Sequence, residues 1–209
     1  MRETIFLLML TILVGCNSHK NENDTLFKEA IIKEESGQYK AAIEIYETIL
    51  DNNPDSATEE LCLYFVSNLQ GKLEDYYEQI TWAGKLIKKN PNSAIAYTQI
   101  GSAFQGLQKY DLALENYWTA TQLDTNAMTP FEAAILAEKN NKPEIAIRFY
   151  KECIKKDSSF LSAYYNISVN LYNIYDYKSA ENYCKILIRL KPNDQKVNEL
   201  YQAIRAKLE

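Results

Sequence analysis

The sequence has few of the residues on which most enzyme active sites depend. A single histidine, His19, excludes most histidine-based catalysis and most zinc sites. The chain has no excess of positive charge: 23 Lys and Arg residues against 28 Asp and Glu residues give a net charge of −5. This balance argues against binding to nucleic acid, which needs concentrated positive charge. Glycine and proline are sparse, with six and five residues, whereas 16 tyrosines are present, which favours a helical protein with aromatic packing.

The first residues, MRETIFLLMLTILVGC, have the layout of an export signal. One positive charge, Arg2, precedes an apolar run from Ile5 to Val14 that is interrupted only by Thr11. Ten helical residues cover about 15 Å, roughly half of the hydrocarbon core of a bilayer. We therefore predict a signal peptide over residues 1–15 rather than a membrane span.

The end of this run, Leu13-Val14-Gly15-Cys16, resembles the bacterial lipobox. The resemblance implies a lipoprotein whose signal peptide is cleaved before Cys16 and whose Cys16 carries several acyl chains, enough for stable anchoring. Asn17 is not the aspartate that retains lipoproteins at the inner membrane in enteric bacteria, which implies the outer membrane, facing the periplasm. The alternative is an ordinary secretory signal that happens to contain a cysteine. The polar residues that follow predict a solvated tether over residues 16–23.

A repeat of 33 to 34 residues occupies most of the remaining chain. Ala42, Ala113, Ala146 and Ala180 hold equivalent positions, and Gln79 replaces the alanine in the second copy. Upstream of each lies a second amphipathic stretch, whose apolar residues recur every three or four positions. The clearest is Tyr97, Ile100, Gly101 and Phe104. Each copy is therefore predicted to be two antiparallel helices. Gly101 and Ala113 are expected to let one such pair cross closely.

This pattern resembles the tetratricopeptide repeat, W-x₂-L-G-x₂-Y followed by A-x₃-F and P. The resemblance implies an all-α fold, a right-handed α–α superhelix (TPR solenoid) of about five helix-turn-helix repeats over residues 24–194. After Pro192, an apolar face formed by Val197, Leu200, Tyr201, Ile204 and Leu208 predicts a C-terminal capping helix over residues 195–209. Thr129, Pro130 and Glu132 predict a helix that starts with Thr129 as its cap.

The remaining chemistry-bearing residues favour structural roles. Cys62, Cys153 and Cys184 lie in apolar helical patterns and are interpreted as core residues, with a Cys153–Cys184 bridge left open. Gly101 and Gly106 have the spacing of a phosphate-binding loop, but the lysine that such a loop needs is absent. Basic pairs such as Lys155-Lys156 close the repeats, where cations meet the negative end of a helix dipole. We expect no catalytic residue, no cofactor and no metal, and hence not an enzyme.

In solenoids of this family, the first helix of each pair lines a concave surface that chooses the ligand. Carried over to this sequence, that pattern implies a groove lined by Phe27, Ile31, Tyr64, Asn68, Ile95, Thr98, Met128, Phe131, Ile135, Tyr165, Val169 and Tyr172. Family members that clamp a C-terminal carboxylate use Lys, Asn and Arg at these sites, where Phe27, Tyr64 and Ile95 stand here. Such a groove suits an apolar peptide face or a partner helix. The alternative is that many of these side chains pack between neighbouring helices.

The sequence thus predicts a membrane-anchored scaffold for protein–protein interaction in the bacterial cell envelope. Its expected partners are another envelope protein, bound in the concave groove, and the membrane, through lipid on Cys16. A second hypothesis is a structural subunit of an envelope assembly or secretion complex that uses its convex or end surfaces. A third is an enzyme or a small-ligand binder.

Overall fold

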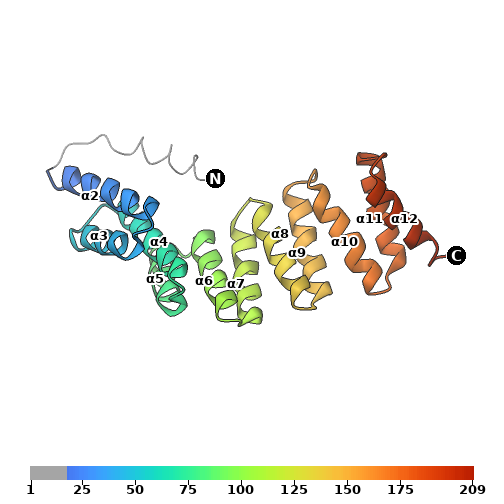
Figure 1. Cartoon of the computed structure of the whole chain (residues 1–209), viewed down its shortest axis with the longest axis horizontal. Coiled ribbons are helices and arrows are strands. Elements are labelled where there is room, and N and C mark those ends of the chain that lie inside the picture. The colour runs from blue at the N-terminus through green and yellow to red at the C-terminus, as the bar shows by residue number, and fades with distance from the viewer. Residues whose placement is uncertain (1–17) are drawn as a thin grey trace. The chain divides into compact units, whose positions relative to one another are not determined.

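The computed structural model describes residues 18–209, which form eleven helices and no strand (Figure 1). They divide into two compact units that meet in sequence between Pro91 and Asn92. The first unit contains α2 (Ser18–Glu35), α3 (Tyr39–Asp51), α4 (Ser56–Lys72) and α5 (Tyr76–Lys89). The second contains α6 (Ala94–Gly106), α7 (Tyr110–Leu123), α8 (Met128–Lys139), α9 (Pro143–Lys156), α10 (Leu161–Asn173), α11 (Tyr177–Leu190) and α12 (Gln195–Arg205).

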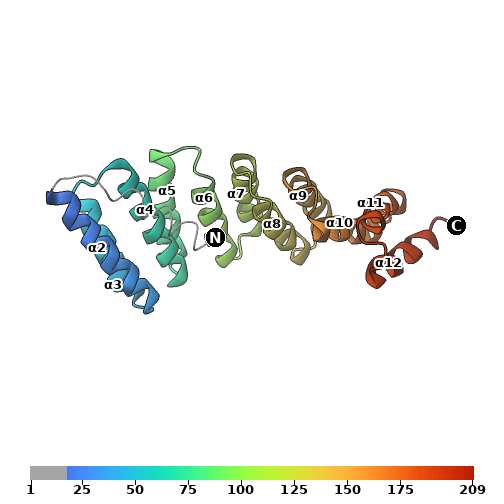
Figure 2. The same ribbon diagram turned by 90° about the horizontal axis from the view of Figure 1, so that it is seen from above.

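Within each unit, every helix packs against the next one along the chain (Figure 2). The pairs α2–α3, α4–α5, α6–α7, α8–α9 and α10–α11 are helical hairpins. The remaining helix, α12, covers the last hairpin with Val197 and Ile204, which are buried. The predicted all-helical fold of successive hairpins with a terminal capping helix is confirmed. Leu208, expected on the same apolar face, follows the end of α12 and is exposed.

The predicted signal peptide and the lipidated Cys16 lie outside the described residues. From residue 18 onward, none of the helices combines the length and the apolar character that a membrane crossing requires.

The first helix begins earlier than the sequence indicated. Residues 18–23, predicted as part of a tether, are the first residues of α2. Asn23 is buried, and its side-chain oxygen accepts a hydrogen bond of 3.2 Å from Nδ2 of Asn52, which follows α3. The polar composition of residues 18–23 did not reveal the start of this helix. The buried side chain of Asn23 is satisfied by Asn52, which lies 29 residues further along the chain.

Small residues set the spacing of the helices within the hairpins. The four repeated alanines are fully buried, and a Cβ on Gly101 would lie 2.9 Å from the Tyr117 ring and 3.2 Å from the Ala113 carbonyl oxygen. The predicted close crossing of α6 and α7 is therefore confirmed. In the second hairpin, the larger Gln79 replaces the alanine, and the facing residue on α4 is Gly71. A Cβ on Gly71 would lie 2.7 Å from the side-chain amide of Gln79. The glycine makes room for the glutamine.

The five hairpin turns share one backbone conformation. In each, a single residue has a positive φ: Gly37 (76°), Glu74 (61°), Gln108 (58°), Asn141 (55°) and Tyr175 (66°). The N–H of the following residue donates to a carbonyl five positions back, as from Lys109 to Phe104 at 2.8 Å. This is the Schellman ending of a helix, which glycine adopts without strain. Only one of the five turns has the glycine.

The start of α8 differs from the prediction. The helix begins at Met128, and the hydroxyl of Thr129 donates to Oδ2 of Asp124 at 3.1 Å rather than capping the helix. Side chains of the preceding loop bond to backbone N–H groups instead. Oδ1 of Asp124 accepts from the N–H of Asn126 at 3.0 Å, and Oδ1 of Asn126 accepts from the N–H of Met128 at 2.9 Å. Two successive Asx turns therefore lead into α8, and no side chain caps its first turn as expected.

The cysteines of the described region are free thiols buried in the core. Cys153 and Cys184 are not bridged, which answers the question that the sequence left open. Burial raises the pKa of the Cys62 and Cys153 thiols to about 12 and that of Cys184 to about 11. The thiols stay protonated at neutral pH, as expected of core residues rather than nucleophiles.

Candidate functional site

The basic residues at the repeat ends are engaged in structure. Nζ of Lys156, at the end of α9, donates to the carbonyl oxygen of Thr121 at 2.7 Å and also to that of Asp124. These carbonyls belong to the end of α7, so the lysine caps the helix of the preceding hairpin rather than its own. Lys89 forms an ion pair with Glu59. Across residues 18–209, no three His, Cys, Asp or Glu side chains gather in a group that could hold a metal ion.

The predicted groove residues fall into two classes. Some pack between helices: the Phe131 ring lies 5.6 Å from that of Tyr150 and 4.8 Å from that of Phe160. Tyr165 and Tyr172 also pack against the core. In the first unit, Phe27 lies between Tyr46 and Phe65, Tyr64 lies against Phe65, and Ile31 and Asn68 are half-buried. For these aromatic residues, packing between helices accounts for the contacts.

The other class is accessible on the first helices of the second unit. Ile95 is 43% exposed and Met128 is 39% exposed, each near the start of its helix. Ile135 and Val169 are half-buried, two turns further along α8 and on α10, respectively. Thr98 is half-buried, and its hydroxyl donates to the Ala94 carbonyl at 3.0 Å. We call the surface formed by Ile95, Met128, Ile135 and Val169 the first-helix face of the second unit.

A hollow of about 320 Å³ opens in this face between α6 and α8. Its lining combines an apolar floor with polar groups, contributed by Ser102, Gln105, Tyr117, Glu132, Ile135, Leu136 and Lys139. On α8, Glu132, Ile135 and Lys139 are spaced by three and four residues, so they form one stripe along the helix. We refer to this feature as the α6/α8 hollow.

Tyr117 organises the polar side of the α6/α8 hollow. Its hydroxyl donates to Oε1 of Gln105 at 3.2 Å and is hydrogen-bonded to Ser102. Burial raises the pKa of Tyr117 to about 12, with a smaller contribution to this rise from the nearby Glu132 carboxylate. Glu132 is exposed and makes no ion pair within the described part of the chain. The hollow thus contains a carboxylate that forms no ion pair, while Lys139 contributes a positive charge to the same lining.

The next junction along the unit, between α8 and α10, uses the same repeat positions but is filled. Tyr150 and Glu138 correspond to Tyr117 and Gln105, and the hydroxyl of Tyr150 is hydrogen-bonded to Glu138. From α10, Nδ2 of Asn166 donates to the Tyr150 hydroxyl at 2.8 Å, and Nδ2 of Asn170 donates to Oε1 of Glu138. Tyr150 is fully buried, and this burial raises its pKa. Two carboxamides therefore close this junction from inside the chain.

The first unit contains a third version, between α2 and α4. Here Tyr46 is fully buried and stacks on Phe65 with ring centroids 5.2 Å apart, while its hydroxyl has no hydrogen-bond partner. Glu34 forms an ion pair of 2.6 Å with Lys72. An aromatic ring closes this junction in place of the carboxamides.

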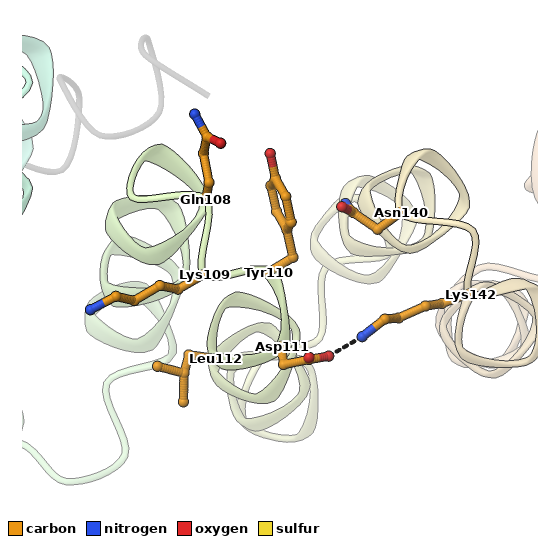
Figure 3. A pocket seen from close by; sticks show the side chains of 7 residues that line it. All are labelled: Gln108, Lys109, Tyr110, Asp111, Leu112, Asn140 and Lys142. Atoms are coloured by element: carbon orange, nitrogen blue, oxygen red, sulfur yellow. Dashed lines mark hydrogen bonds and ion pairs between the residues drawn. The ribbon is translucent and has the colours of Figure 1, made fainter.

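A second hollow, of about 450 Å³, lies where the α6–α7 and α8–α9 turns approach each other (Figure 3). Lys142, at the start of α9, reaches Asp111 in the first turn of α7 and forms an ion pair with it. Such a pair between exposed groups contributes little to stability. The pair links neighbouring hairpins, and we do not assign a ligand to this hollow.

Sequence reasoning did not identify the polar half of the α6/α8 hollow. Ser102, Gln105 and Glu132 were not among the predicted groove residues, and Glu132 was interpreted as part of a helix cap. One signal was available: Glu132 and Lys139 share the helical stripe of Ile135, which was predicted. The partners on α6 and α7 depend on how neighbouring repeats stack, which one repeat's spacing does not show.

The hairpins, their shared turns and their junctions define the chain as a helical-repeat protein. Residues 24–56 match the tetratricopeptide repeat family. In solved structures, the chain is similar to a MamA protein, with 19% identity, 83% of this chain and 94% of the other covered, and a TM-score of 0.63. A tetratricopeptide repeat protein from Parabacteroides merdae ATCC 43184 is 13% identical, with 90% and 74% coverage and a TM-score of 0.64.

A third similar structure is that of YrrB, described as a TPR protein with an unusual peptide-binding site. It is 15% identical, with 90% of this chain and 100% of the other covered and a TM-score of 0.59. None of the curated proteins is significantly similar in sequence. At these identities the structural similarity shows the fold alone. The chain has the tetratricopeptide-repeat fold.

Proposed function

We propose that this protein is a scaffold that binds a peptide or helix of a partner protein on the first-helix face of its second unit. The observation that carries this proposal is the accessible apolar side chains of that face, Ile95 and Met128, on the same two helices as a hollow lined by polar groups. An apolar patch next to fixed polar groups is typical of sites that bind peptides. The peptide-binding site named for YrrB, which shares the fold, supports the same use.

A charge-insertion experiment tests this proposal. The double variant Ile95→Glu/Met128→Glu places two carboxylates on the first-helix face, where both side chains are partly exposed and the fold should tolerate them. The matched control is Leu112→Glu/Leu190→Glu, whose leucines are 41% and 50% exposed on the second helices α7 and α11. Phe131 and Tyr165 are unsuitable for this test, because both contribute to packing.

We expect the partner protein to be captured from envelope extracts by the wild type and by the control, but not by the first-helix variant. All three proteins should have the same circular dichroism spectrum. Loss of capture by the control alone would support the alternative role, a structural subunit that associates through its other surfaces. Equal capture by all three would contradict the proposal.

We further propose that the protein is a lipoprotein anchored through Cys16 in the bacterial envelope, on the periplasmic side of the outer membrane. The support is the sequence Leu13-Val14-Gly15-Cys16 at the end of the apolar run. The wild type should incorporate a labelled fatty acid and sediment with outer membranes. Cys16→Ala should lose the label and either remain unprocessed or leave the membrane, whereas Cys62→Ala, in the core, should keep the label. A processed and membrane-bound Cys16→Ala would contradict the anchor.

A further inference from the structure

We propose that the α6/α8 hollow recognises a carboxamide side chain, from an asparagine or glutamine, of the bound partner. This inference rests on the proposed function, because it names the chemistry that the first-helix face selects. It comes from the comparison of two junctions that use the same repeat positions in the same unit.

The filled α8/α10 junction shows what such a site accepts. There, a carboxylate, that of Glu138, sits beside a buried tyrosine, and the chain supplies the N–H donors from carboxamides on α10. Asn170 donates to Glu138 with one amide group, and Asn166 donates to Tyr150 with another. At this junction, carboxamides are thus the groups that bond to both the carboxylate and the tyrosine, one to each.

The α6/α8 hollow has the tyrosine and a carboxylate, that of Glu132, but α8 supplies no carboxamide to it. The positions of Asn166 and Asn170 are occupied by Glu132 and Leu136, neither of which carries an N–H donor. The hydroxyl of Tyr117 is already satisfied by Ser102 and Gln105. The groups left for a ligand are the Glu132 carboxylate, which only accepts, and the Nε2 amide of Gln105, which only donates.

A carboxamide matches this pair of groups better than charged or aliphatic side chains do. Its N–H₂ can donate to Glu132 while its oxygen accepts from Gln105. A lysine or arginine side chain offers no acceptor to Gln105, and Lys139, on the same lining, opposes a second cation. A carboxylate would be repelled by Glu132. An aliphatic side chain would leave both polar groups without a partner.

Peptide selection on the full-length protein tests the inference. A displayed library of random dodecapeptides is selected in parallel on the wild type, on Glu132→Ala and on Glu144→Ala. Glu144 is an exposed glutamate in the first turn of α9, outside the hollow, and serves as the matched control. Because both glutamates are exposed, neither variant should change folding by more than about 0.5 kcal/mol.

We expect peptides selected on the wild type and on Glu144→Ala to share an asparagine or glutamine at one position. Replacing that residue by leucine should weaken binding about tenfold to hundredfold, as expected for a lost hydrogen bond to a charged group. Glu132→Ala should lose both the preference and that difference. Replacement of Glu132 by asparagine, which supplies the carboxamide from the chain itself, should also abolish the preference.

The outcomes separate the two proposals. Peptides that bind the first-helix face, as shown by loss of binding to Ile95→Glu/Met128→Glu, but show no carboxamide preference would overturn this inference and leave the proposed function intact. A preference for arginine or lysine that depends on Glu132 would overturn it in the same way. Selection of no peptide on the wild type would count against both.

Discussion

The α8/α10 and α6/α8 junctions of the second unit are built on the same repeat positions and differ in how their polar groups are satisfied. In the α8/α10 junction, Tyr150 is fully buried, and carboxamides from the next helix bond to it and to Glu138. In the α6/α8 junction, Tyr117 is bonded within its own hairpin, and Glu132 faces a hollow. One or two substitutions on the first helix of a repeat thus decide whether a junction is closed or open.

This difference separates stability from recognition within one unit. Closed junctions use their hydrogen bonds to hold neighbouring hairpins together. An open junction leaves the same kind of groups for a partner, at some loss of stability in the free protein. Because each repeat contacts only its neighbours, one junction can be open for binding, and less stable, without altering the other junctions.

The largest expected effect comes from opening the closed junction. Asn170→Leu copies Leu136 into the position of Asn170 and removes the N–H donor to the Glu138 carboxylate. The free energy of unfolding should fall by about 2–3 kcal/mol, because a hydrogen bond to a charged group is lost in a buried site. Urea unfolding followed by circular dichroism measures this. The matched control is Asn173→Leu, at an exposed asparagine on the same helix, which should change the free energy of unfolding by less than about 0.5 kcal/mol. Equal losses for the two variants would show that the amide of Asn170 does not hold the junction together.

Alkaline pH should weaken the open junction through Tyr117. Its pKa is raised from 10.0 to about 12 in the folded protein, so folding favours the protonated phenol. The resulting stability is complete below pH 10 and is lost as the pH rises through 12. Because Tyr117 is partly exposed, we expect the loss over this window to be about 1–2 kcal/mol.

The measurement is the difference between the wild type and Tyr117→Phe in unfolding free energy across this pH range. The substitution should flatten the decline, while Tyr46 and Tyr150, whose pKa values burial also raises, continue to contribute in both proteins. Ultraviolet titration of phenolate should show one fewer late-ionising tyrosine in the variant. Parallel curves for the two proteins would mean that Tyr117 ionises as freely as an exposed tyrosine.

The sequence predicted those features that repeat within each hairpin. The buried alanines, the close approach at Gly101 and the core cysteines follow from spacing and side-chain size, which are local properties. Features that depend on a partner one repeat away were not predictable from local patterns. The buried pair of Asn23 and Asn52 and the hydrogen bonds of Lys156 across hairpins are of this kind.

The candidate site was predictable only in part for the same reason. Helical periodicity placed Ile95, Met128 and Ile135 on the first helices, and these residues are accessible. It could not separate them from Phe131, which occupies the same face but packs against Tyr150 and Phe160. How deeply a side chain on this face is buried depends on the aromatic residues that the following helices and loops place against it.

A smaller effect is expected from the glycine that supports the open junction. Gly101→Ala places a Cβ 2.9 Å from the Tyr117 ring, which must move. Overpacking of this kind costs about 1–3 kcal/mol, and the better helix propensity of alanine returns about 1 kcal/mol, so we expect a net loss of about 1 kcal/mol. Gly84→Ala is the matched control, because no atom lies within 4 Å of its Cβ position, and it should stabilise the protein. Thermal unfolding of both variants shows whether each substitution raises or lowers stability. Stabilisation by both would mean that the Tyr117 ring shifts freely.

The smallest effect concerns the turns that precede the second helices of the two hairpins. Gln108, in the α6–α7 turn, has a φ of 58°, and Asn141, in the α8–α9 turn, has a φ of 55°. A left-handed conformation strains most side chains but costs asparagine less, because its short amide tolerates it. Gln108→Gly should therefore stabilise the protein by about 0.5–1 kcal/mol and Asn141→Gly by only a few tenths. Equal gains in chemical unfolding would show that the strain at Gln108 is no greater than that at Asn141.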